Sequence, residues 1–346
     1  MSHSDIEFIQ LQAKNGKVGL ITLQRPQALN ALTLAMCKAI DDNLVQWEED
    51  DNIKAVVIQG EGERAFCAGG DVRWVYEEGR ENPQRALEFF DQEYRMNKRL
   101  FHFSKPFIAL MHGITMGGGL GVSVHGSHRV GAETLMLAMP ETGIGFYPDI
   151  GGSYFLPRCP GKFGWHLGLT GDKISANDAF YLGLIDFVID RSDFAQIIDQ
   201  LTNLTFEDDA HTQVSQLLKS WQLPMQQSPL IADQAEIDHY YTAKTVEEIV
   251  ERLQQSSTPR AEQILKMLKE KSPTSLKITL ELLHQGAQQD FDTCMDHEFK
   301  LTQHFLKHHD FYEGVRAALI DKDRKPLWQP RNLREIDDNL LTQWLG

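Results

Sequence analysis

Cysteine is scarce in this chain of 346 residues, and its placement excludes several kinds of site. Cys37, Cys67, Cys159 and Cys294 are widely separated, and no two of them form a C-x-x-C pair. Without clustered cysteines and histidines, neither a zinc site nor a disulfide framework is expected. A metal-free protein in a reducing, cytoplasmic location fits this cysteine usage best.

Long hydrophobic runs and a targeting segment are lacking as well. No apolar run approaches the length of a membrane span. The first residues, MSHSDIEFIQ, show neither the basic-then-apolar pattern of a secretion signal nor the arginine-rich character of a transit peptide. We therefore expect no membrane partner and a mature protein that begins here.

Positive charge is in short supply too. Lysine and arginine number 34 against 49 aspartates and glutamates, which gives a formal net charge of −15. Nucleic acids and anionic membranes are bound through basic faces, so neither is an expected partner. The hydrophobic fraction of 42% is enough for a well-buried core in one large domain or two ordinary ones.

The first half of the chain alternates predicted strands and helices. Apolar strand patterns flank Asn15-Gly16, a dipeptide that favours the turn of a β-hairpin. Hydrophobic periodicity then predicts, in order, a helix over 31–48, a strand over 54–60, a helix over 86–100 and a strand over 107–113. This alternation indicates an α/β core.

After about residue 205 the strand patterns give way to polar helical ones. In TVEEIVERLQQ, Thr245 and Glu248 have the spacing of a capping box, and in SPTSLKITLELL, Ser272 and Pro273 are placed to begin a helix. We therefore predict an α/β core over residues 1–205 and a helical C-terminal region over residues 206–346 that packs on it.

Two glycine-rich segments each follow a predicted strand. GITMGGGLG (113–121) leaves backbone N–H groups free at the start of a helix, where negative charge is favoured. In the second segment, Gly69-Gly70 precedes Asp71, a residue suited to cap a helix. One N–H group from each strand end could hold a single oxyanion, which is the arrangement that acyl transfer needs.

Two other motifs fit the same glycines incompletely. A dinucleotide-binding G-x-G-x-x-G needs a third glycine where Val122 stands. A serine-hydrolase G-x-S-x-G needs a glycine where His125 stands. Neither function is therefore favoured.

The segment MPETGIGFYPDIGG (139–152) holds two acids, Glu141 and Asp149, and neither lysine nor arginine. Its glycines and prolines favour a turn that brings the two carboxyl groups together. The pair would then suit acid–base chemistry, and crowding would raise the pKa of at least one of them. In the alternative interpretation Glu141 only begins a short helix and Asp149 only caps the next one.

Taken together, the motifs resemble the enoyl-CoA hydratase/isomerase (crotonase) superfamily, and within it most closely the 3-hydroxyisobutyryl-CoA hydrolase branch. The segments that carry the resemblance are RPQALNAL (25–32), AFCAGGDVR (65–73), HGITMGGGLG (112–121), MPETGIGFYPDIGG, SPTSLKITL (272–280) and DFYEGVRAALIDKD (310–323). The resemblance implies a spiral of ββα units that binds an acyl-CoA thioester, with no cofactor besides the CoA of the substrate. Members often form trimers or hexamers, so a homo-oligomer is compatible with it.

Several residue roles follow from the resemblance alone. By motif, the amides of Gly70 and Gly118 form the oxyanion hole and the backbone near Ala68 meets the adenine. A substrate contact falls on Glu93. Basic residues of the C-terminal region, Arg316, Lys322 and Lys325, resemble positions near the CoA phosphates.

One departure from the hydratase pattern distinguishes the possible reactions. Similar hydratases carry a glutamate two positions past the triple glycine, where this chain has Gly121. Glu141 then has Asp149 as its partner, as in the hydrolases, and the resemblance implies hydrolysis of a short-chain 3-hydroxyacyl-CoA such as 3-hydroxyisobutyryl-CoA. An enoyl-CoA hydratase or isomerase and a non-catalytic CoA-binding protein remain the alternatives.

Two remaining features are expected to be unremarkable. His308-His309-Asp310 is interpreted as a solvated helix end rather than a metal site, because no other ligands cluster with it. Cys67 is interpreted as a small buried hydrophobic residue.

Overall fold

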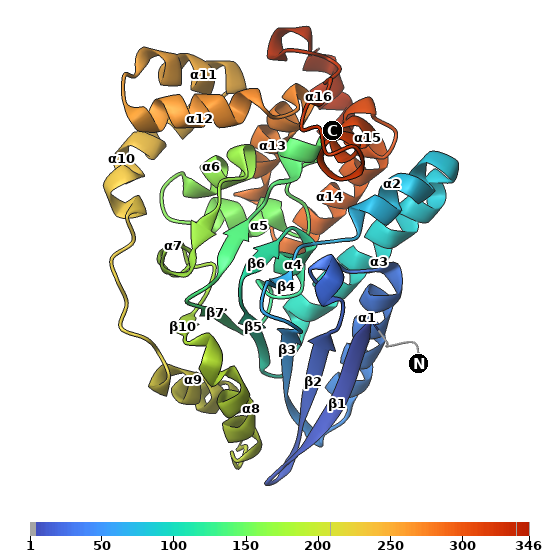
Figure 1. Ribbon diagram of the computed structural model, residues 1–346, viewed down its shortest axis with the longest axis vertical. Helices are drawn as coiled ribbons and strands as arrows, with labels where there is room; N and C mark the ends of the chain where they lie inside the picture. The colour runs from blue at the N-terminus through green and yellow to red at the C-terminus, as the bar shows by residue number, and fades with distance from the viewer. Residues whose placement is uncertain (1–4, 208, 337, 346) are drawn as a thin grey trace. The chain divides into compact units, whose positions relative to one another are not determined.

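A computed structural model describes residues 5–207, 209–336 and 338–345 (Figure 1). The chain forms two compact units, each assembled from three separate stretches. Unit 1 comprises residues 1–70, 92–137 and 174–228, and unit 2 comprises residues 71–91, 138–173 and 229–346. The expected boundary at residue 205 stays a prediction, since neither unit is a single continuous stretch of chain.

Unit 1 is built on a six-stranded sheet in the order β1-β2-β3-β5-β7-β10. Its strands are β1 (Ile6–Ala13), β2 (Gly16–Leu23), β3 (Ile53–Gly60), β5 (Phe107–Met111), β7 (His128–Ala132) and β10 (Phe187–Ile189). The expected hairpin is confirmed, but Ala13 pairs with Gly16, so its turn residues are Lys14 and Asn15. The other neighbours are parallel, as the alternation of strands and helices predicts.

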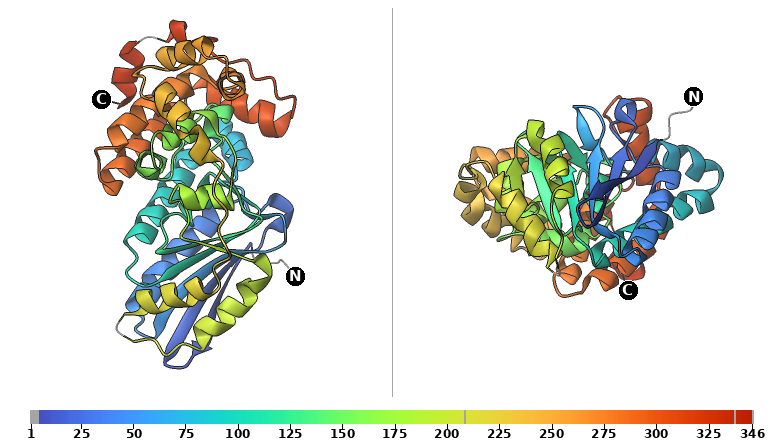
Figure 2. Two further views of the ribbon diagram at one scale, coloured as in Figure 1. Left: turned by 90° about the vertical axis from the view of Figure 1, so that its left-hand side faces the viewer. Right: turned by 90° about the horizontal axis from the view of Figure 1, so that it is seen from below.

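Helices cover both faces of this sheet (Figure 2). Helix α1 (Leu34–Glu49) begins at the cap Thr33 and places Trp47 against Gly19, where a Cβ would lie 2.6 Å from the indole ring. On the other face, α8 (Phe194–Thr202) and α9 (Ala210–Ser220) bury apolar side chains against the strands, including Phe194 and Leu218. The inner strands β3 and β5 are therefore buried on both sides, which explains their largely apolar sequences, whereas the edge strand β1 stays partly exposed.

A second sheet of unit 1 has four short strands in the order β4-β6-β8-β9. They are β4 (Ala65–Cys67), β6 (Ile114–Met116), β8 (Met136–Ala138) and β9 (Ile174–Ser175). Gly70 and Gly118, the two residues expected to hold the oxyanion, come shortly after the ends of β4 and β6. Strands of two or three residues show no measurable alternation, and the hydrophobic pattern did not predict them.

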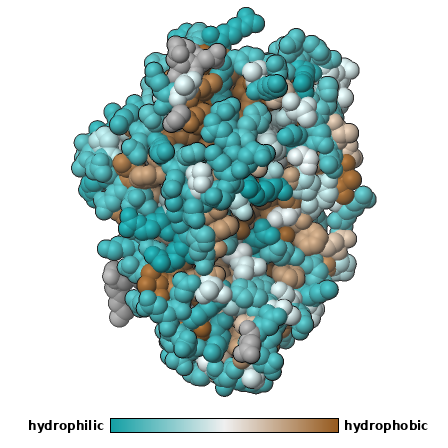
Figure 3. Space-filling model, turned by 180° about the vertical axis from the view of Figure 1, so that it is seen from behind, coloured by the Kyte–Doolittle hydropathy of each residue, from teal (hydrophilic) through white to brown (hydrophobic). Residues whose placement is uncertain are grey.

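Unit 2 is helical. Its longer helices are α2 (Val72–Glu81), α6 (Phe163–Thr170), α10 (Leu230–Tyr241), α11 (Val246–Gln255), α12 (Pro259–Lys269), α13 (Pro273–Gly286), α14 (Phe291–Phe305), α15 (His309–Val315) and α16 (Asp338–Leu345), and the first part of α3 (Pro83–His102) also belongs to it. In the described chain no strand follows β10, so the helical character predicted for the C-terminal region is confirmed. None of the described helices is long and apolar enough to span a membrane. Figure 3 shows one face of the molecule, where hydrophilic side chains prevail.

The two helix starts predicted in unit 2 are capped as expected, with one exception. The Ser272 hydroxyl accepts the Ser275 N–H at 3.1 Å and Pro273 opens α13, as predicted. The Thr245 hydroxyl accepts the Glu248 N–H at 3.1 Å, but the Glu248 carboxylate accepts the N–H of Lys244 rather than that of Thr245. The predicted capping box is therefore only half formed.

The expectation of a solvated helix end at His308-His309-Asp310 is wrong for Asp310, although α15 does begin there and His309 is exposed. Asp310 is fully buried and accepts the Ser272 hydroxyl at 2.6 Å and the Gln329 N–H at 2.7 Å. It ties the start of α13 to α15 and to the segment that follows. The sequence could not show this, because the two partners lie 38 and 19 residues away.

Candidate functional site

The segment that holds Gly69 and Gly70 is fixed in place by the motif RPQALNAL (25–32). Ala68 N–H donates to the Leu29 carbonyl at 2.9 Å, and Leu32 N–H donates to the Gly69 carbonyl at 2.8 Å. The Asn30 side chain donates to the Ala65 carbonyl at 2.9 Å. The Ala68 N–H is thus engaged within the protein, which leaves its carbonyl as the backbone group for a ligand.

The two glycine segments converge in unit 1. Gly118 opens α4 (Gly118–Gly121), and a Cβ placed on it would lie 3.1 Å from the Gly70 nitrogen and collide with the Glu93 carboxylate. A Cβ on Gly69 would lie 3.5 Å from the Gly118 nitrogen. Within the described chain, no acceptor takes the N–H of Gly70 or Gly118. Two amides therefore face one small space, lined by Glu93.

The acid that lines this space is buried among thiols. Glu93 lies on α3 and is 2% exposed. Burial raises the pKa of the Cys67 thiol to about 12, the Gly69 carbonyl bond lowers it, and the charge of Glu93 raises it again. Burial also raises the pKa of Cys37, with Glu93 contributing. Cys67 is therefore a protonated, apolar neighbour of the space and no nucleophile.

The two acids of MPETGIGFYPDIGG lie in unit 2, on a turn as predicted. Glu141 opens a short 3-10 helix (Glu141–Ile144), which Gly145 ends with φ 70°. Asp149 is followed by Ile150 and Gly151 at φ 52° and 84° and then by α5 (Gly152–Phe155). Both acids are buried, at 6% and 5% exposure.

The helix-cap interpretation of these acids is wrong for one of them. Glu141 does begin a short helix. Asp149 is not the cap of α5, because the residue at the start of α5 is Gly151 and no side-chain cap bond forms there.

Aromatic rings pack behind the acid turn. Phe146 stacks on Tyr147 at 4.6 Å and on Phe90 at 5.3 Å between ring centroids, and Phe305 and Phe311 contact it at 5.4 and 5.6 Å. Such packing excludes water from this side of the turn. Glu141 and Asp149 therefore lie in surroundings where charge is costly to bury.

The fold supplies a cation that the segment itself lacks. The Lys271 ammonium would lie 3.4 Å from a Cβ placed on Gly143, within the acid turn. Burial lowers the pKa of Lys271, while the charges of Glu270, Asp172 and Glu141 raise it. The acids are therefore not isolated from positive charge, and no local sequence signal could have identified this lysine.

Sequence reasoning also missed Glu298, a fully buried acid on α14. Its carboxylate accepts backbone N–H groups from Gly151 and Ser153, directly after Asp149. The sequence contained no local signal for it, because Glu298 stands among polar residues in MDHEFK.

Arg316, a candidate for binding phosphates, is occupied by acids. Its guanidinium pairs with Glu313 and Asp323 at 2.8 Å and with Asp321 at 2.6 Å. Lys322 and Lys325 are exposed. The expectation that this region meets CoA phosphates stays a prediction, and the two lysines are the candidates with less competition.

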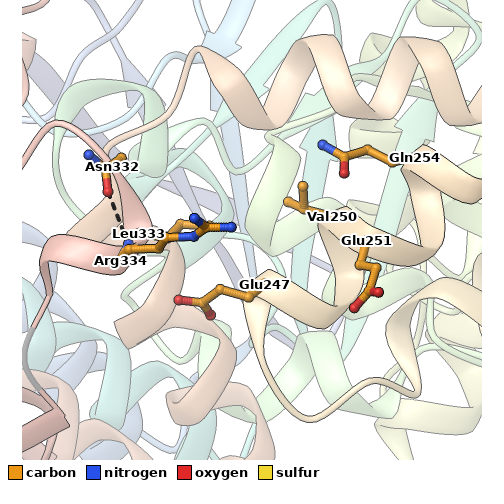
Figure 4. A pocket seen from close by; sticks show the side chains of 7 residues that line it. All are labelled: Glu247, Val250, Glu251, Gln254, Asn332, Leu333 and Arg334. Atoms are coloured by element: carbon orange, nitrogen blue, oxygen red, sulfur yellow. Dashed lines mark hydrogen bonds between the residues drawn. The ribbon is translucent and has the colours of Figure 1, made fainter.

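A cavity of about 740 Å³ lies elsewhere in unit 2, between α11 and the short helix Leu333–Glu335 (Figure 4). It is lined by Glu247, Val250, Glu251, Gln254, Asn332, Leu333 and Arg334. None of the predicted site residues is among them. In the described part of the chain, no three histidine, cysteine or acidic side chains are grouped to hold a metal ion.

Known proteins resemble this chain over nearly its full length. The enoyl-CoA hydratase/isomerase family matches residues 18–345. The chain is 41% identical to the mitochondrial 3-hydroxyisobutyryl-CoA hydrolase of Bos taurus, covering 99% of this chain and 90% of that protein. It is 40% identical to the mitochondrial 3-hydroxyisobutyryl-CoA hydrolase of Homo sapiens, covering 97% and 88%.

Two solved structures are similar over nearly the whole chain. A carnitinyl-CoA dehydratase from Mycobacterium thermoresistibile is 34% identical with a TM-score of 0.90, and an enoyl-CoA hydratase from Rhodobacter sphaeroides 2.4.1 is 37% identical with a TM-score of 0.87. Each match covers 99% of this chain and 97% of the other. The crotonase-like fold expected from the motifs is confirmed.

Proposed function

Because this chain belongs to the enoyl-CoA hydratase/isomerase family, we propose that it hydrolyses a short-chain 3-hydroxyacyl-CoA thioester. The substrate that fits best is 3-hydroxyisobutyryl-CoA, and the products are 3-hydroxyisobutyrate and CoA, a reaction of valine breakdown. The observation that carries the proposal is identity of 41% and 40%, over nearly the full chain, to hydrolases of that substrate. Gly121, in the place of the first of the two hydratase glutamates, supports the same reaction.

In the proposed reaction, the oxyanion hole belongs to the amides of Gly70 and Gly118. Their N–H groups, free within the described chain, polarise the thioester carbonyl and stabilise the oxyanion that forms on it. One such donor contributes roughly 10²–10³ in rate. Glu93, whose carboxylate borders Gly118, is proposed to contact the substrate, and the Ala68 carbonyl to meet the adenine.

Glu141 and Asp149 are proposed to supply the acid–base chemistry. Glu141 either attacks the carbonyl carbon or removes a proton from the water that does. If Glu141 attacks, the carbon–sulfur bond breaks to give a mixed anhydride, which water then hydrolyses to the product acid and free Glu141. If water attacks, its oxygen bonds to the carbonyl carbon and the carbon–sulfur bond breaks directly. On either route CoA leaves as the thiolate and takes up the proton that the water gave to the carboxylate. Asp149 orients the water, the substrate hydroxyl, or both. The proposed steps use neither a metal nor a cofactor.

The test is thiol release from 3-hydroxyisobutyryl-CoA by the wild type, by Glu141→Gln and by Glu262→Gln, an exposed glutamate on α12. We expect Glu141→Gln to lose at least about 10² in rate and the control to lose nothing. A Glu141→Gln enzyme that works at the wild-type rate would show that the assigned role is wrong.

Crotonyl-CoA and 3-hydroxypropionyl-CoA separate the remaining alternatives. Loss of the crotonyl double bond without free thiol would favour a hydratase, the function named for one of the similar structures. Tight CoA binding without turnover of any thioester would favour a non-catalytic protein. Thiol release from 3-hydroxypropionyl-CoA would show how far the acyl preference extends.

A further inference from the structure

Helix α14 reaches the turn around Asp149 with three side chains spaced four residues apart. Cys294 and Glu298 interact with Ser153 on α5, and Thr302 bonds to Tyr147 before the turn. Figure 1 shows α14 beside α5. A single helix face thus contacts the chain on both sides of Asp149.

Glu298 has the most complete set of partners in this group. One carboxylate oxygen accepts the Gly151 N–H at 2.7 Å, and the other accepts the Ser153 N–H at 3.0 Å and the Ser153 hydroxyl at 2.5 Å. All these groups are buried. Two of these three bonds come from backbone N–H groups, so Glu298 fixes the backbone that follows Asp149.

The backbone so fixed is strained. Ile150 has φ 52° and Gly151 has φ 84°. The left-handed conformation costs a β-branched residue roughly 1–2 kcal/mol, so it persists only where other contacts impose it. The Glu298 bonds impose it here, and the direction in which Asp149 points depends on it.

The chain before Asp149 is fastened to the same helix. The Tyr147 hydroxyl bonds to the Thr302 hydroxyl at 2.8 Å and donates to the backbone carbonyl of Glu298. Asp149 therefore lies between two attachments to one turn of α14, which restricts its motion in both chain directions.

The pKa of Glu298 is also unusual for a glutamate. Burial raises the pKa of Glu298 to about 8, the bonds from Ser153 and Gly151 lower it, and the charge of Asp149 raises it. Its other titratable neighbours are Cys294 on its own helix, whose pKa burial raises to about 11, and the Tyr147 phenol. Burial and the charge of Asp149 thus both favour the protonated form of Glu298.

We propose that Glu298 is the positioning residue of Asp149: its bonds to Gly151 and Ser153 hold the left-handed turn that follows this acid. The inference rests on the hydrolase function proposed above. Ionisation of Glu298 places a second negative charge beside Asp149, and repulsion between the two carboxylates then disturbs the position of Asp149.

The experiment measures kcat and KM for 3-hydroxyisobutyryl-CoA across pH in the wild type, Glu298→Gln and Ser153→Ala. Glutamine has nearly the same volume as glutamate, but its side-chain NH2 group replaces one of the two oxygens that accept the N–H groups of Gly151 and Ser153. We expect Glu298→Gln to lose about tenfold or more in kcat with KM within about twofold. The wild-type kcat should fall as pH rises through about 8, and that fall should be absent in Glu298→Gln.

Ser153→Ala keeps the inference testable even if Glu298→Gln does not fold. It removes a bond that lowers the pKa of Glu298, so the alkaline fall in kcat should move to higher pH. Glu281→Gln, a partly exposed glutamate on α13 that bonds to Gln285, is the control and should match the wild type.

Each outcome separates the two proposals. A wild type that releases no thiol overturns the hydrolase function and this inference together. An active wild type whose Glu298→Gln variant keeps the same kcat, or loses kcat with the alkaline fall unchanged, overturns the inference alone. The inference is also overturned if kcat of Ser153→Ala falls over the same pH range as kcat of the wild type.

Discussion

Replacing Gly118 by alanine tests the oxyanion hole with one methyl group. The added Cβ would lie 3.1 Å from the Gly70 nitrogen and collide with the end of the Glu93 side chain. A carbonyl oxygen that accepts the Gly70 N–H would lie about 2.7–3.1 Å from the same nitrogen. The methyl group and the oxyanion therefore compete for one position.

The size of the effect follows from what the methyl group displaces. Gly118 is not among the residues with positive φ, so alanine is compatible with its backbone, and the Glu93 side chain can move away. Loss of one oxyanion donor costs about 10²–10³ in kcat, or roughly 3–4 kcal/mol of transition-state stabilisation. Displacing the oxygen from both amides should cost at least that much.

The assay is thiol release from 3-hydroxyisobutyryl-CoA, together with thermal unfolding of each variant. Gly183→Ala is the matched control: nothing lies within 4 Å of its Cβ, but its φ of 72° makes alanine strained there. It should lose stability and keep kcat, whereas Gly118→Ala should keep most of its stability and lose kcat. A folded Gly118→Ala enzyme with kcat within about threefold of the wild type would refute the reasoning.

Three further predictions concern stability and reactivity. Folding raises the pKa of Glu298 from 4.5 to about 8, so the bound proton stabilises the protein fully below about pH 4.5 and no longer does so once the pH passes 8. The melting temperature of the wild type should therefore be lower at about pH 9 than at about pH 5, and this difference should be smaller in Glu298→Gln. Ser272→Ala removes the cap of α13 and the bond to buried Asp310, so urea unfolding should show a loss of about 1–3 kcal/mol, against almost none for exposed Ser257→Ala. All four cysteines are buried, so a thiol reagent should titrate four thiols only after denaturation; rapid labelling of Cys67 in the native protein would contradict its burial.

Local patterns in the sequence predicted most of the elements that carry the site. The strand over 54–60 and the helix over 86–100 correspond to β3 and α3, and Asp71 accepts the Trp74 N–H as the cap of α2. These features depend on neighbours within a few residues, and such signals are readable in one chain. The glycine and acid motifs were located for the same reason.

Features that depend on tertiary contacts were not readable. Lys271 stands about 130 residues after Glu141, and the partners of Glu298 precede it by 147 and 145 residues. The absence of a cation within MPETGIGFYPDIGG therefore said nothing about the cation that packs against it. The cytoplasmic location also stays a prediction, since the vertebrate relatives are named as mitochondrial proteins.

Ile150 shows why the turn around Asp149 can be strained and stable together. A glycine would remove the cost of the left-handed backbone, roughly 1–2 kcal/mol for a branched residue. Yet the Ile150 side chain is fully buried, and burying it contributes about 1.5–3 kcal/mol. Burial of the Ile150 side chain therefore offsets the strain, and the hydrogen bonds of Glu298 stabilise the turn further. Asp149 is held by an apolar anchor on one side and by the Tyr147 hydroxyl on the other, so its position does not depend on a bound substrate.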